Sequence, residues 1–248
     1  MSSKPVGIAA LSIEGVSKRF GGLVAVDNMS FMLSENEVLG LIGPNGSGKT
    51  TMLNLISGAL KPSSGAIRLY GDDVSALPPS AIATRGVART FQIVRMLPAL
   101  TVLENVAAGG VFGHSRRWGR DLEDHARALL RRVGLQEAGD IPVTALTYID
   151  QKRVELARAL AGDPKILLLD EWLAGLNPTE LTTGISLIEQ IRGEGRTIII
   201  VEHVMDAIRS LCDRCVVMNS GSKIAEGKPR EVLADAEVIR AYLGDADA

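Results

Sequence analysis

The sequence predicts an α/β fold in which a mainly parallel sheet carries an antiparallel β edge near the N-terminus and an inserted helical subdomain. Alternating strand and helix patterns predict the sheet: one set begins at about residue 38, and the other runs from about residue 165 to residue 227. Between the two sets, from about residue 95 to residue 162, the pattern is almost entirely helical. β-branched, period-two patterns across residues 8–42 predict the antiparallel edge.

We expect one domain spanning residues 1–248. Its core would comprise residues 1–94 and 163–248, and its helical subdomain residues 95–162. The expected strands lie at 8–13, 24–33, 38–42, 66–70, 87–91, 165–170, 197–201 and 215–218. The expected helices lie at 49–60, 101–108, 122–133, 148–161 and 229–243.

Composition narrows the functional classes. The formal net charge of −2 gives no basic field for nucleic acid, and interleaved acids make the arginines of residues 116–132 a solvated helix face. No apolar run approaches the roughly 18 residues of a membrane span, and the N-terminus lacks a signal-peptide core. We therefore expect a cytoplasmic protein whose attachment to a membrane comes through a partner. The spacing of Cys212 and Cys215 allows a redox or zinc role, but two reduced packing residues explain it better because structural zinc needs four ligands.

Residues 43–50 carry the most informative motif, G-x-x-x-x-G-K-T. It lies between an apolar strand and a helical run, which is the context that a phosphate-binding P-loop needs. Backbone N–H groups of the loop would surround a polyphosphate, Lys49 would reach the β- and γ-phosphates, and the Thr50 hydroxyl would bind Mg²⁺. The predicted nucleotide-binding residues of this segment are Gly43, Pro44, Asn45, Gly46, Ser47, Gly48, Lys49, Thr50 and Thr51. The motif predicts that the chain binds a nucleoside triphosphate together with Mg²⁺.

Polar residues follow three other predicted strands. Asp170 and Glu171 end an apolar strand, where parallel sheets bind ligands. Asp170 would hold Mg²⁺ and Glu171 would polarise the attacking water; the alternative is a pair of solvated loop acids. His203 occupies the equivalent position after the next strand, where it could contact the γ-phosphate. Gln92 ends a short strand and is weak as a signal by itself.

Taken together, these residues resemble the ATP-binding subunit of an ABC transporter over nearly the whole chain. The resemblance implies that Phe20 stacks on adenine with Val26 beside it, although Phe20 could instead be a strand-end core residue. It also implies that Gln92 contacts Mg²⁺ and the attacking water, and that His203 acts as the switch histidine. The remaining motifs are a signature loop at residues 146–150 and a D-loop at residues 174–177.

The amino-acid sequences of several segments most resemble the branched-chain amino acid uptake subfamily. These segments are residues 17–26, 89–92, 100–106, 174–178 and 223–244. The resemblance implies a peripheral protein on the cytoplasmic face of the inner or plasma membrane. Its partners would be transmembrane permease subunits, a second ATPase subunit and a periplasmic or extracellular substrate-binding protein. Those other chains select the substrate.

The signature loop departs from the family pattern Leu-Ser-Gly-Gly-Gln, or Leu-Ser-Tyr-Gly-Gln in this branch. Thr147 keeps a hydroxyl, but Ile149 replaces glycine and Asp150 replaces a neutral amide. A β-branched residue obstructs close backbone approach, and a carboxylate repels a triphosphate, so a heterodimer with a normal signature on the other subunit is favoured. Trp172 stands where the family usually has Pro. The alternatives are a non-hydrolysing, nucleotide-dependent ABC scaffold and a soluble ABC ATPase.

Overall fold

A computed structural model describes residues 9–243, and it confirms the predicted α/β class. The antiparallel edge is a four-stranded sheet of order β2-β1-β4-β5. Its strands are β1 (Ala9–Phe20), β2 (Leu23–Ser34), β4 (Ser64–Leu69) and β5 (Asp72–Asp73). The hairpin between β1 and β2 turns at Gly21, whose φ of 57° suits a glycine. The turn leaves Phe20 at the end of β1.

The second sheet has six strands in the order β10-β9-β3-β8-β7-β6, and only β10 runs antiparallel to its neighbour. Its strands are β3 (Val38–Ile42), β6 (Val87–Arg89), β7 (Ile166–Asp170), β8 (Thr197–Val201), β9 (Arg214–Asn219) and β10 (Ser222–Gly227). Because five strands run in parallel, the segments that follow β3, β7 and β8 emerge at one edge of the sheet. This edge collects the residues predicted to carry the chemistry.

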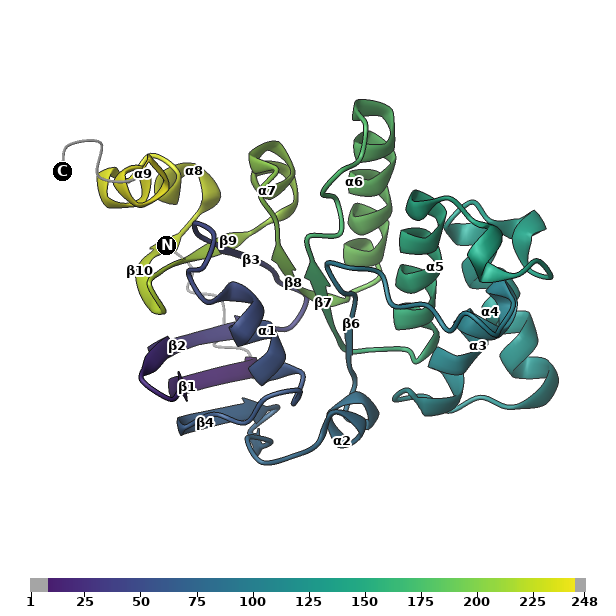
Figure 1. Cartoon of the computed structure of the whole chain (residues 1–248), viewed down its shortest axis with the longest axis horizontal. Helices are drawn as coiled ribbons and strands as arrows, with labels where there is room; N and C mark the ends of the chain where they lie inside the picture. The colour runs from purple at the N-terminus through teal and green to yellow at the C-terminus, as the bar shows by residue number, and fades with distance from the viewer. Residues whose placement is uncertain (1–8, 244–248) are drawn as a thin grey trace, which may run out of the picture.

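Helices cover the sheets and extend to one side. Those between β3 and β7 are α1 (Lys49–Ile56), α2 (Pro79–Thr84), α3 (Val102–Phe112), α4 (Gly119–Arg132) and α5 (Tyr148–Ala161), with short 3₁₀ turns at Gln136–Ala138 and Val143–Ala145. Those after β7 are α6 (Pro178–Gly193), α7 (Met205–Leu211), α8 (Pro229–Val232) and α9 (Ala236–Leu243). Figure 1 shows α3, α4 and α5 grouped beyond α6, and α1 packed between the two sheets. None of the helices in residues 9–243 is long and apolar enough to cross a membrane.

Two apolar clusters fill the interior, one on each face of the six-stranded sheet. β8 shows how its residues divide, because successive side chains of a strand point to opposite faces. Ile198 and Ile200 join the cluster that includes α5 and α6, whereas Ile199 and Val201 join the cluster under α1 and the antiparallel sheet. All four side chains are fully buried, which explains the continuous apolar run of the strand.

The expectation of one helix at residues 229–243 is wrong. The chain forms α8 and α9 there, separated by three residues. The Asp235 carboxylate accepts hydrogen bonds from the N–H groups of Glu237 and Val238, at 2.7 and 3.3 Å, and so begins a new helix. The helix expected at 49–60 also ends early, at Ile56.

Candidate functional site

The P-loop links β3 to α1, and two of its glycines are required by close backbone neighbours. Gly43 has a φ of 150° and Gly48 a φ of 106°. A Cβ at Gly43 would lie 2.1 Å from the carbonyl oxygen of Met218, and one at Gly48 would lie 2.5 Å from that of Ala25. Gly48 also precedes the first residue of α1, so the unpaired N–H groups of that helix begin in the loop. The local backbone is therefore shaped for an anion.

Lys49 lies almost completely inside this loop. Its Nζ donates to the carbonyl oxygens of Gly43 at 2.7 Å and Pro44 at 2.9 Å, and the residue is 6% exposed. Burial lowers the pKa of Lys49, while the nearby carboxylates of Glu171 and Asp170 oppose that change. The ammonium is thus held at the loop by its own backbone, within the electrostatic reach of both acids.

A cavity of about 740 Å³ opens in front of the P-loop. Its lining residues are Phe20, Leu23, Val24, Ala25, Asn45, Gly46, Ser47, Gly48, Lys49, Thr50, Thr51, Gln92, Glu171, Ser220 and Gly221. Phe20 is 45% exposed, which gives its ring a free face and argues against the core alternative. Val26 is fully buried in the core instead, and Val24 and Ala25 take the places beside the cavity. The lining combines an aromatic ring at one end with the phosphate loop and an acid at the other.

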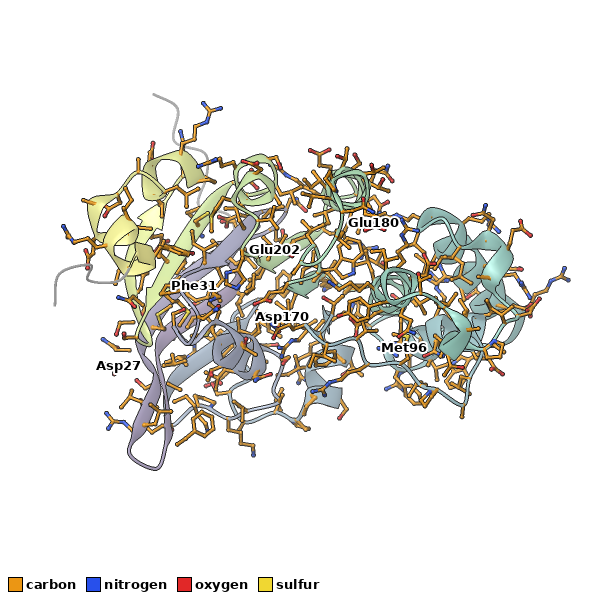
Figure 2. The ribbon with its side chains drawn as sticks, turned by 45° about the horizontal axis from the view of Figure 1, so that its top comes forward. Asp27, Phe31, Met96, Asp170, Glu180 and Glu202 are labelled. Carbon is orange, nitrogen blue, oxygen red and sulfur yellow. The ribbon has the colours of Figure 1, made fainter. Side chains whose placement is uncertain are left out.

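Asp170, at the end of β7, is buried and carries an unsatisfied oxygen. Its Oδ2 accepts a hydrogen bond from Arg89 Nη2 at 2.7 Å, and both side chains are nearly inaccessible. Its Oδ1 is buried and has no hydrogen-bond partner among the described residues. Figure 2 shows Asp170 well inside the molecule. A buried carboxylate oxygen that has no hydrogen-bond partner among the described residues fits Mg²⁺, which prefers oxygen ligands.

Two of the predicted residues, Gln92 and His203, converge on the carboxylate of a third, Glu171. Glu171 Oε2 accepts a hydrogen bond from Gln92 Nε2 at 2.7 Å, and Glu171 Oε1 lies 3.0 Å from His203 Nε2. The Glu171 backbone has a φ of 50°, which is uncommon for a residue other than glycine. Its N–H donates to the carbonyl oxygen of Val201 on β8 at 2.8 Å. Two segments far apart in the chain, one at Gln92 and one at residues 201–203, therefore fix the position of Glu171.

The signature residues lie apart from this cavity, at the start of α5. Thr147 Oγ1 accepts the N–H of Asp150 at 3.3 Å and donates to its carboxylate at 2.8 Å. The same carboxylate pairs with Arg153 at 3.0 Å, which offsets part of its negative charge. Ile149 is half-buried and borders a separate cavity of about 260 Å³ beside Trp172. In a single chain, these residues do not reach the P-loop cavity.

Several residues near the site carry no motif signal. Arg89 pairs with the Asp170 carboxylate, although the two residues are 81 positions apart in the chain. No local sequence pattern predicts this pair. Glu202 is fully buried, and its Oε1 accepts the N–H of Leu173 at 2.6 Å. Burial raises the pKa of Glu202 to about 7, against the opposing effects of that hydrogen bond and of Lys152. Its place next to His203 in the sequence was the one available signal.

Comparisons with known proteins agree with this geometry. A family profile described as "ABC transporter" matches residues 26–174, and one described as "Branched-chain amino acid ATP-binding cassette transporter" matches residues 222–248. The high-affinity branched-chain amino acid transport ATP-binding protein LivG of Salmonella typhimurium is 41% identical, over 95% of this chain and 98% of its own length. The corresponding BraF of Pseudomonas aeruginosa is 38% identical, over 98% of this chain and its whole length.

Solved structures give the same result. A nucleotide-free ATP-binding cassette from an ABC transporter superposes with a TM-score of 0.87 at 31% identity, covering 96% of this chain and all of that one. A dimeric cassette in a post-hydrolysis state, bound to ADP and Pi, superposes with a TM-score of 0.81 at 26% identity, covering 89% of this chain and 99% of that one. From the fold, the P-loop cavity and these matches, the chain belongs to the ABC transporter family and is one of its ATP-binding, ATP-hydrolysing subunits.

Proposed function

We propose that this subunit powers the import of branched-chain or related amino acids. Support for the substrate class comes from the full-length relatives, whose names give branched-chain amino acid transport, and from the matching C-terminal profile. The observation that carries the catalytic part is the convergence of Gln92 and His203 on the Glu171 carboxylate at the edge of the cavity. An acid held in this way beside a phosphate loop is placed to act on a water molecule.

The predicted residues that line the cavity or contact Glu171 have roles in the proposed site, whereas Val26 lies in the core and has none there. Phe20 stacks on adenine, and the backbone N–H groups of the P-loop with Lys49 hold the phosphates. Thr50, Asp170 and Gln92 would hold Mg²⁺, which would supply positive charge against the β- and γ-phosphates.

Hydrolysis at this site depends on Glu171. Glu171 accepts a proton from the attacking water, and His203 contacts the γ-phosphate while keeping the carboxylate in place. Each oxygen of the Glu171 carboxylate has a further acceptor position, so a water can hydrogen-bond to it while Gln92 and His203 stay in contact.

ABC subunits of this kind work with membrane permeases, form dimers and are peripheral to the membrane. We place this subunit on the cytoplasmic face, next to a permease that receives substrate from an external binding protein. The segment that follows Gln92 supports this placement: Ile93 is 78% exposed, and Leu97 and Phe112 lie at a groove of about 580 Å³ that α3 borders. Movement of Gln92 on ATP binding would then reach the permease directly.

The signature loop favours a heterodimer. In the proposed dimer each ATP lies between the P-loop of one subunit and the signature of the other. Two copies of this chain would place Ile149 and Asp150 at both sites, whereas a partner with a glycine-containing signature would complete the P-loop, Glu171 and His203 of this chain. The pairing of Asp150 with Arg153 reduces the repulsion, but a β-branched residue at position 149 would still limit how closely the loop backbone approaches a phosphate.

A second function is suggested by the same loop: a nucleotide-dependent scaffold that hydrolyses ATP poorly. Coexpression with the neighbouring genes, followed by purification from membranes, separates the candidates. We expect permease subunits to copurify, and vesicles containing the complex and its binding protein to accumulate leucine, isoleucine or valine only with ATP inside. Recovery only in the soluble fraction would contradict the transport function, and uptake of none of the three amino acids would contradict the substrate class.

A further inference from the structure

Lys152 is a buried cation that the proposed mechanism does not use. It lies in α5, one turn after Tyr148, and it is 2% exposed. Its Nζ donates to three carbonyl oxygens that follow β7: Glu171 at 3.3 Å, Trp172 at 3.0 Å and Ala174 at 2.7 Å. An ammonium group has three N–H donors, so this one carbonyl cluster satisfies all of its hydrogen-bonding capacity.

Trp172 also hydrogen-bonds back to Lys152. Its indole Nε1 donates to the carbonyl oxygen of Lys152 at 3.0 Å, in a position that is 2% exposed. The ring packs against α6, where a Cβ at Gly184 would lie 3.2 Å from its Cζ3. A proline at this position could not make that hydrogen bond, because it has no side-chain donor. We call the four hydrogen bonds joining Lys152 with Glu171, Trp172 and Ala174 the α5 clasp.

The α5 clasp acts on the unusual backbone of Glu171. One of its hydrogen bonds ends on the carbonyl oxygen of Glu171, and the N–H of the same residue is held by Val201. Both polar groups of a left-handed residue are therefore tied, which fixes the direction in which its side chain leaves the backbone. The direction is toward Gln92 and His203.

Stability alone does not account for this arrangement. Burial lowers the pKa of Lys152, and the carboxylates of Glu202, Glu155 and Glu171 oppose that change. Replacing a complete buried ion pair by apolar side chains is often neutral or stabilising, so a buried charge by itself is weak evidence for a purely stabilising role. The lysine is better explained by a role in orienting the backbone after β7, because its ammonium group contacts all three carbonyl oxygens there.

We propose that Lys152 is a positioning residue that holds the Glu171 backbone in its hydrolytic geometry and ties this acid to the signature helix α5. The proposal rests on the proposed role of Glu171. Because α5 also carries Thr147, Ile149 and Asp150, the α5 clasp mechanically joins the acid of one ATP site to the loop that faces the other site. Tyr148 adds to this connection: its hydroxyl donates to the carbonyl oxygen of Gln92 at 3.3 Å.

The test compares Lys152→Met and Lys152→Arg in the purified transport complex, with Lys165→Met as a matched control on an exposed lysine. We expect Lys152→Met to lower kcat for ATP hydrolysis at least about tenfold, since small misplacements of a catalytic group have effects of this size or larger. The Kd for ATP should stay within about threefold of the parent, because Lys152 makes no contact with the P-loop. Lys152→Arg retains a cation with several donors and should recover kcat to within about threefold of the parent. Lys165→Met should leave both constants unchanged.

Parental kcat in Lys152→Met would overturn the proposal, as would equal losses of kcat and ATP binding in both the Met and Arg variants. If Lys152→Met does not fold, Trp172→Phe removes the indole donor together with part of the ring; we expect a kcat about threefold lower with unchanged Kd, and a parental kcat would overturn the proposal. Glu171→Gln is measured in parallel. Parental hydrolysis in Glu171→Gln would contradict the proposed function itself, whereas a loss there combined with parental Lys152→Met would contradict the α5 clasp alone.

Discussion

Glu202 makes the stability of this protein depend on pH in a direction that can be worked out. Burial raises the pKa of this carboxyl from its ordinary value of 4.5 to about 7. Below pH 4.5 it is protonated in both the folded and the unfolded chain, so it has no effect. Between the two values the unfolded chain releases the proton and the folded chain keeps it, so the free energy of unfolding falls as pH rises. Above about pH 7 the penalty is constant.

The size of the effect follows from the two pKa values. Each pKa unit corresponds to about 1.4 kcal/mol, so the difference between 4.5 and about 7 amounts to about 3 kcal/mol. Glu202→Gln removes the ionisation while keeping an oxygen that can accept the N–H of Leu173. Urea unfolding of both proteins from pH 5 to pH 9 gives the assay. We expect the stability of the parent minus that of the variant to fall by about 2.5 kcal/mol between pH 5 and pH 8, because part of the full change has already occurred at pH 5. A constant difference would refute the reasoning, because Glu155 and the other titrating groups are common to both proteins.

Two further predictions concern the nucleotide. Lys49→Ala should weaken ATP binding at least about a hundredfold, because hydrogen bonds to charged groups contribute about 1.5–3 kcal/mol each. Equilibrium binding of labelled ATP measures this change, and parental affinity would contradict the phosphate role of Lys49. Ile149→Gly combined with Asp150→Gln should raise the ATPase rate of a homodimer of this chain by roughly tenfold. Loss of a hydrogen-bond donor to the transition state costs about a hundredfold or more. We expect a smaller gain on restoring the loop because Arg153 already offsets part of the Asp150 charge. The gain should be smaller in the heterodimer, and equal homodimer rates before and after the change would remove the argument for asymmetry.

The phosphate site could be predicted from sequence because its parts are local. The P-loop occupies eight consecutive residues, and Asp170 and Glu171 directly follow a buried strand. The parallel order of the sheet then brings these segments to one edge, so motif and fold support each other. The resemblance to ABC transporter ATP-binding subunits predicted that Gln92 and His203 belong to the site. In the structure both contact the Glu171 carboxylate.

The connections between distant segments could not be predicted in the same way. The pairing of Arg89 with Asp170 and the α5 clasp join residues that are 81 and about 20 positions apart, and no spacing rule relates them. Val26 lies in the core while Val24 and Ala25 line the cavity because β2 bulges here: Lys18 pairs with Val26 but Arg19 pairs with Val24, which interrupts the regular alternation of the strand. The break between α8 and α9 depends on the side chain of Asp235 capping a new helix, which an amphipathic pattern does not reveal.

Glu171 is the central residue of the proposed mechanism, because its carboxylate accepts a proton from the attacking water. The most direct measurement is the amount of ATP retained by the complex carrying Glu171→Gln, compared with its steady-state hydrolysis. The substitution keeps a side chain of the same shape but cannot accept the proton, so ATP should stay bound at about one molecule per completed site while turnover falls by at least about a hundredfold. Hydrolysis at the parental rate, or loss of ATP binding together with turnover, would contradict the account.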